Sequence, residues 1–134
     1  MHVRKELWPV IALGVLVAGF LVYRYMLSSM ALFECAHRVL SEEASPDGQY
    51  VATVSERNCG AVTAYSRVVS IRRREAPFEG ENTESWVFVI SDQPEVKAVW
   101  SGTRQLTILH SATAGKQKEA ERWRDVVIMT RESY

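Results

Sequence analysis

The chain has 134 residues, with 16 Lys plus Arg side chains against 16 Asp plus Glu side chains and only two cysteines. This length holds one small domain beside a membrane segment, and the balanced charge excludes the basic surface that nucleic-acid binding requires. Four Trp, five Tyr and four Phe residues favour a folded domain over a disordered tail.

The first element is an apolar run at 7–27, LWPVIALGVLVAGFLVYRYML, with no charged side chain before Arg24. As a helix it would cover roughly 31 Å, the thickness of a bilayer's hydrocarbon core. We predict a transmembrane helix at 7–27 after a cytoplasmic N-terminus at 1–6, then a stalk at 28–35 and an extracytoplasmic β domain at 36–134. Arg4 and Lys5 indicate this orientation, because basic residues favour the cytoplasmic side.

A cleaved signal peptide is the alternative to this anchor. Ser29-Met30-Ala31 places small residues at the two positions that a signal peptidase reads. The apolar run is longer than the core of about 7 to 15 residues that signal peptides have, which favours the anchor. Within the run, Gly14 and Ala18 form a small-xxx-small pair, and such pairs let two membrane helices pack closely. We expect these two residues to be the packing face of the helix, if it has one.

The rest of the chain alternates short β-favouring runs with turn signals. The predicted strands lie at 37–43, 49–57, 66–73, 86–90, 96–100, 105–110 and 125–130. The run at 49–57 alternates apolar and polar side chains and predicts a half-buried strand, whereas the run at 86–90 is apolar on both faces and predicts a central one. Residues 75–85 form a predicted loop, and the polar stretch at 112–122 is expected to contain one helical turn.

Six to seven short strands at regular spacing predict an all-β domain. We expect a small antiparallel meander, folded as a sandwich or a part-open barrel and preceded by the single N-terminal helix. The turn signals that join its strands are Ser45-Pro46-Asp47-Gly48, Asn58-Cys59-Gly60 and Ser101-Gly102-Thr103.

Cys35 and Cys59 both follow the apolar run. Outside the cytoplasm, an even cysteine count in a small domain predicts one disulfide, and two free thiols are the alternative. A zinc site built from these cysteines with His37 and His110 lacks the usual ligand spacing. A Cys59–His110 nucleophile and base pair lacks a third member, and His110 is expected at the surface or rim. We therefore expect no metal, no cofactor and no catalytic residue.

Two features are candidates for an interaction surface. Arg72, Arg73 and Arg74 form the densest charge run and would suit an acidic partner or acidic lipid headgroups. The alternative is a solvated strand end neutralised by the acidic residues between 75 and 84. Trp86, Trp100 and Trp123 are expected to belong to the core. Trp123 is the exception to consider, because it lies in a polar stretch, where an exposed aromatic side chain indicates an interface.

The run at 45–63, SPDGQYVATVSERNCGAVT, resembles a family of small, uncharacterised bacterial proteins with an SPDG-strand-CGA pattern behind an N-terminal membrane segment. Its SPDG turn and following strand also resemble the opening of a β-propeller blade, with a degraded second copy at 100–106. Two such units cannot close a propeller. The family resemblance implies a bacterial, membrane-tethered β domain, and it implies no activity. We expect the helix to lie in the bacterial inner membrane.

These observations favour a non-enzymatic single-pass membrane protein whose β domain binds a protein partner. The expected role is an accessory subunit of an envelope complex or an immunity-type protein. The alternative is a ligand-binding or sensory module at the membrane surface. An enzyme is disfavoured because no carboxylate pair, nucleophile elbow, metal motif or phosphate loop is present in the sequence.

Overall fold

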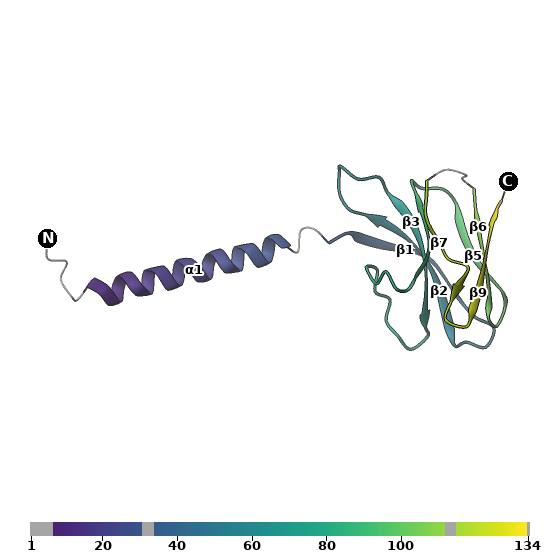
Figure 1. Ribbon diagram of the computed structural model, residues 1–134, viewed down its shortest axis with the longest axis horizontal. Helices are drawn as coiled ribbons and strands as arrows, with labels where there is room; N and C mark the ends of the chain where they lie inside the picture. Colours follow the sequence, from purple (N-terminus) through teal and green to yellow (C-terminus); the bar gives the residue numbers. More distant parts are fainter. Residues whose placement is uncertain (1–6, 31–33, 112–114, 134) are drawn as a thin grey trace. The chain divides into compact units, whose positions relative to one another are not determined.

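The computed structural model describes residues 7–30, 34–111 and 115–133 (Figure 1). It contains two compact units, Met1–Glu34 and Cys35–Tyr134. The first unit holds the helix and the second holds every strand.

Helix α1 runs from Trp8 to Met30 and is long and apolar enough to cross a membrane. It continues past Leu27 into the predicted stalk. The hydroxyls of Ser28 and Ser29 donate to the carbonyl oxygens of Arg24 and Tyr25, both at 3.0 Å, and this local bonding is compatible with a continued helix. The predicted stalk is therefore shortened at its N-terminal side.

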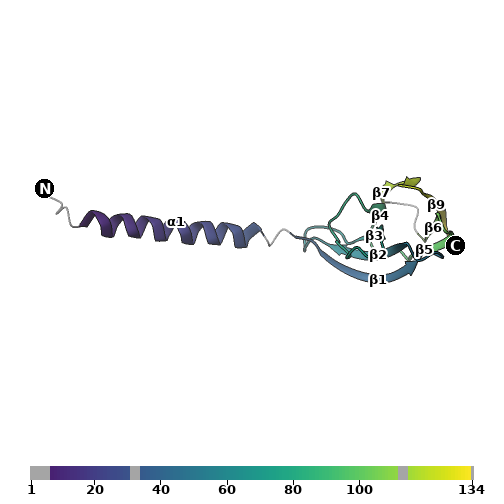
Figure 2. The same cartoon turned by 90° about the horizontal axis from the view of Figure 1, so that it is seen from below.

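The second unit is all-β, as predicted, and its strands form two sheets (Figures 1 and 2). The five-stranded sheet has the order β1-β2-β3-β4-β7 and the four-stranded sheet has the order β5-β6-β9-β8. The strands are β1 Ala36–Ala44, β2 Tyr50–Asn58, β3 Ser66–Arg73, β4 Trp86–Ser91, β5 Val96–Gly102, β6 Gln105–His110, β7 Lys116–Glu119, β8 Arg122–Trp123 and β9 Val126–Glu132. All seven predicted strands are present.

Two features of the sheets differ from the expected meander. The stretch predicted to contain a helical turn forms β7 and β8 over its described part, and β7 is a polar, exposed strand at the sheet edge. Its backbone pairs with β4, so its side chains need no apolar pattern. In addition, β6 and β9 pair in parallel, whereas the other pairs are antiparallel. The fold class is thus confirmed, with two more strands than predicted and a mixed second sheet.

The hydrophobic core lies between the two sheets. Strand β2 contributes Tyr50, Ala52 and Val54, and the fully buried Phe88 of β4 lies in the same cluster as residues of β6 and β9. Burial of this apolar area is the main stabilising term of the domain.

The expectation that β2 is half-buried is wrong. Val51, Thr53 and Ser55 alternate with the core residues, yet they are also buried, as are Val68 and Ser70 of β3. This outer face carries the cover segment, which we define as residues 74–85 and whose Ala76 carbonyl oxygen accepts a hydrogen bond from Arg72 of β3. Contacts of Gly80 and Glu81 with residues of β1, β2 and β4 anchor this segment on the outer face of the sheet. Pattern alone does not reveal such a cover, because it is a loop.

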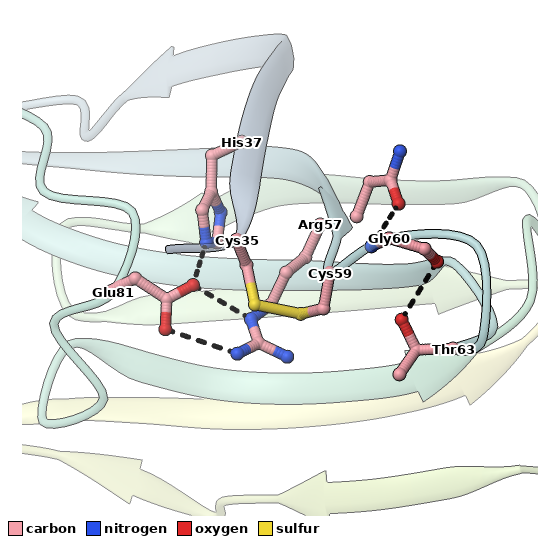
Figure 3. Close-up of a disulfide and its surroundings, with 8 residues drawn as sticks. Cys35, His37, Arg57, Cys59, Gly60, Thr63 and Glu81 are labelled. Carbon is pink, nitrogen blue, oxygen red and sulfur yellow. Dashed lines mark hydrogen bonds and ion pairs between the residues drawn. A yellow bond between two sulfur atoms is a disulfide. The ribbon is translucent and has the colours of Figure 1, made fainter. Parts of the chain in front are cut away.

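The predicted disulfide joins Cys35 and Cys59, and no free cysteine is found in the described chain (Figure 3). It closes the end of the β1–β2 pair, where Ala36 lies opposite Asn58. Both thiols are consumed by this bond, so neither the zinc arrangement nor the Cys59–His110 pair is formed. His110 is buried rather than at the rim, with its ring stacked 5.4 Å from that of Phe88.

Candidate functional site

The arginine run at the end of β3 divides into side chains with different surroundings. Arg72 is held internally: its Nη2 lies 2.9 Å from Oε1 of Glu42 and its Nη1 donates to the carbonyl oxygen of Ala76 at 2.8 Å. Arg73 and Arg74 are exposed. None of the ion pairs found between described residues involves Arg73 or Arg74. Arg73 and Arg74, and not Arg72, therefore carry the positive charge that is available to a partner.

Trp123 is partly buried and packs against the hydrophobic core, and three contacts orient its indole ring. Its Nε1 donates to the carbonyl oxygen of Glu84 at 3.1 Å, and its ring meets the Tyr50 ring edge-on at 5.5 Å. The guanidinium of Arg124 lies 4.9 Å from the centre of the indole ring. Arg124 has a φ of 52°, in the left-handed region that non-glycine residues rarely adopt. This conformation costs free energy and is of the kind that often accompanies a functional surface.

One groove, with a volume of about 390 Å³, is lined by Arg72, Arg73, Trp123 and Arg124 together with residues of the cover segment. It lies where the end of β3, the cover segment and the β8–β9 turn meet. Its lining residues are Ser70, Ile71, Arg72, Arg73, Ala76, Pro77, Phe78, Glu79, Asn82, Glu84, Ser85, Trp123 and Arg124. Arg72, Arg73 and Trp123, predicted separately as interaction residues, are therefore brought together, whereas Arg74 is not among the lining residues.

The groove carries both signs of charge over an apolar floor. Arg73 and Arg124 contribute positive charge, and Glu79 and Glu84 contribute negative charge. None of these four is in an ion pair among the described residues. Unpaired charges around an aromatic side chain resemble the polar rim and aromatic core of protein interfaces. The balance of signs gives little net attraction for a small anion.

One side of the groove is buttressed by an ion-pair network around Arg104. Its guanidinium bonds Asp47 at 2.6 Å and Asp125 at 2.7 Å, and it lies 4.9 Å from the centre of the Tyr50 ring. The hydrogen bond from Ser45 and the guanidinium of Arg104 lower the pKa of Asp47 to about 2. Tyr50 donates its hydroxyl to Asp125 at 2.9 Å, which fixes the ring on which Trp123 packs.

The other wall of the groove is the cover segment, which is fastened near the disulfide (Figure 3). Glu81 accepts two bonds from Arg57, at 2.9 and 3.2 Å, and lies 2.6 Å from Nε2 of His37. The bonds from Arg57, and to a smaller extent the one with His37, hold the pKa of Glu81 below its usual value. Trp86 donates to the carbonyl oxygen of Gly80 at 2.9 Å. The acid Glu81, expected to neutralise the arginine run, thus has other partners.

Some site residues were not predicted from the sequence. Arg124 lines the groove and was not predicted, although its position next to Trp123 could have indicated it. Glu79 and Glu84 were expected beside the arginine run, but not in one groove with Trp123. The predicted packing face of α1 at Gly14 and Ala18 remains a prediction. The described residues contain no group of three His, Cys, Asp or Glu side chains that could hold a metal ion.

Comparisons with family models, with curated proteins and with solved structures gave no match. The groove therefore has to be interpreted from its own geometry and charge.

Proposed function

We propose that this chain is a non-enzymatic single-pass membrane protein whose β domain binds a protein partner through the groove beside Trp123. Helix α1 supplies the membrane anchor, and the Cys35–Cys59 disulfide favours an oxidising compartment for the domain. Combined with Arg4 and Lys5 before the helix, this favours a cytoplasmic N-terminus and a domain in the periplasm or outside the cell. The family resemblance supports a bacterial inner membrane.

One observation supports the partner-binding role above all. Arg73 and Trp123 are far apart in the sequence, yet they line the same groove with Arg124. Trp and Arg are enriched at protein interfaces and at the residues that dominate their binding energy. The presence of Glu79 and Glu84 in the same groove favours a polypeptide surface of mixed charge. An accessory subunit of an envelope complex and an immunity-type protein both fit this description.

A ligand-binding or sensory module is the second candidate. The observation that favours it is the size of the groove, since about 390 Å³ lies within the range of small-molecule sites. The balanced charge argues against a small anion, so the occupant would be a neutral or zwitterionic molecule. Native mass spectrometry of the detergent-solubilised chain distinguishes the two: a retained small molecule favours the module.

The partner-binding proposal is tested by photo-cross-linking in the native membrane. A photoreactive residue at Asn82, which lines the groove, should cross-link one envelope protein. The same residue at Lys97, an exposed position on β5, is the matched control and should not. Arg73→Glu should abolish the cross-link from position 82, whereas Lys97→Glu should leave it. Equal cross-linking from both positions, or no effect of Arg73→Glu, contradicts the proposal.

The placement of the domain is tested by a fusion. Alkaline phosphatase joined through a linker after Tyr134 should be active, because the enzyme needs an oxidising compartment for its own disulfides. An inactive fusion that is expressed at normal levels would overturn the extracytoplasmic placement.

A further inference from the structure

The hairpin tip, which we define as residues 60–65 between β2 and β3, is apolar and uncharged but exposed. Every residue in it is exposed, and Val62 retains 97% of its accessible surface. Tyr65 is 41% exposed. A single exposed apolar side chain is ordinary, but a turn that combines valine, tyrosine and two alanines without any charge is not.

The tip has a defined shape that presents Val62. The backbone N–H and hydroxyl of Thr63 both donate to the carbonyl oxygen of Gly60, at 3.3 and 3.2 Å (Figure 3). Asn58 accepts the N–H of Gly60 at 2.9 Å. Gly60 has a φ of 109°, which permits the chain reversal. The turn is closed by its own bonds, and its apolar side chains are left for another surface.

The position of the tip in the domain suggests which surface this is. Cys59, next to the tip, is bonded to Cys35, the first residue of the β domain. Cys35 follows the last residue of α1, Met30, by five positions. Five residues span at most about 18 Å when fully extended. The chain that follows the apolar, membrane-length helix therefore enters the β domain at the end that carries the tip.

We propose that the hairpin tip inserts into the lipid interface of the membrane that α1 crosses. This inference rests on the proposed membrane anchor. Valine and alanine would enter the boundary between headgroups and acyl chains, and the Tyr65 ring would lie at headgroup level, as interfacial aromatic side chains do. The exposed charges near the tip are acidic: the N–H of Asp92 donates to the Tyr65 carbonyl oxygen at 2.7 Å, and Glu34 precedes the Cys35 that is bonded to Cys59. Contact is thus apolar and independent of anionic lipid.

Fluorescence quenching by lipid tests this contact in the full-length chain. Val62→Cys is labelled with an environment-sensitive dye under non-reducing conditions and reconstituted in zwitterionic vesicles containing nitroxide-labelled phosphatidylcholine. The control label is at Thr103, exposed on the β5–β6 turn. Its neighbour Arg104 bonds Asp47, which precedes β2, whereas the tip follows β2, so the two labels lie at opposite ends of the β domain.

The label at position 62 should be quenched several-fold more strongly than the label at position 103. Equal quenching at the two positions overturns the inference. A third label at Val15, in the middle of α1, separates the inference from the anchor. Quenching at 15 without quenching at 62 overturns the tip contact alone, and no quenching at 15 overturns the anchor and the tip contact together.

A second pair of variants tests whether apolar contact is the cause. With the dye at Ala61, Val62→Asp should reduce quenching to the level at position 103, and Val62→Leu should retain it. Because the side chain at position 62 is exposed, both variants should keep the disulfide and the thermal midpoint of the parent chain. Unchanged quenching in Val62→Asp overturns the inference.

Discussion

Gly80→Ala tests how firmly the cover segment is held on the five-stranded sheet. A Cβ atom at Gly80 would lie 2.6 Å from Cδ2 and 2.9 Å from Cβ of His37, and closer still to Cγ. Such contacts are far inside the optimal carbon–carbon separation of about 3.5 to 4.0 Å. Gly80 has no positive φ, so the conflict is purely steric.

The expected cost follows from the contacts that must change. The His37 ring has to turn away, which removes its 2.6 Å bond to Glu81, worth about 1 to 2 kcal/mol for a partly exposed pair. An off-rotamer ring adds about 0.5 to 1.5 kcal/mol. Loss of glycine's freedom in the unfolded chain offsets about 0.4 to 1 kcal/mol. We expect a net destabilisation of about 2 kcal/mol.

Urea unfolding of the full-length chain in detergent, followed by near-ultraviolet circular dichroism, measures this change. In a His37→Ala background the ring is absent and only the 2.9 Å contact with the Cβ of residue 37 remains, so Gly80→Ala should cost about 1 kcal/mol less than in the parent chain, and the two substitutions should couple. Gly102→Ala is the matched control, because its Cβ would meet Gln105 at an ordinary 3.5 Å. Additive effects of the His37 and Gly80 substitutions would refute the steric clamp.

Three further predictions concern stability. Replacing Cys35 and Cys59 by serine should cost about 3.5 kcal/mol in urea unfolding, because the bond closes a loop across a sequence separation of 24; equal stability with and without reductant would contradict it. Phe88→Ala should cost about 3 to 5 kcal/mol, since the side chain is 0% exposed, and a loss below about 1 kcal/mol would place Phe88 outside the core. The folded-state pKa of Asp47 is lowered from 3.8 to about 2, so its contribution is complete above pH 4 and is lost as the pH falls towards 2. Asp47→Asn should therefore reduce the loss in the free energy of unfolding over that pH range. An unchanged pH dependence of the free energy of unfolding would show that the bonds to Arg104 and Ser45 contribute nothing.

The strands that could be predicted from the sequence are those whose apolar side chains pack in the hydrophobic core. β2, β3 and β4 carry apolar residues at the spacing that a sheet requires, and their predicted ranges match the structure within one residue at each end. β7 could not be found in this way, because an edge strand that pairs only through its backbone has no apolar face. The polar stretch was therefore expected to contain a helical turn.

The groove could be predicted only in part, for two physical reasons. Trp123 stands out as an aromatic residue in a polar stretch, and the arginine run stands out by charge. The sequence cannot show that Arg72 is paired with Glu42, since that partner lies on another strand. Nor does it indicate that Arg124 adopts a left-handed conformation over the Trp123 ring. Both facts arise from tertiary packing.

The place of β9 determines when this domain can fold in the cell. It is the last strand in the sequence, yet it lies inside the four-stranded sheet between β6 and β8 and buries Val126 and Ile128 in the core. Until β9 has been synthesised, the edge of β6 that pairs with β9 has no neighbour. A nascent chain that still lacks β9 would thus display an open strand edge, which is a site for pairing with other chains. Synthesis of β9 is therefore the step that covers this edge of β6.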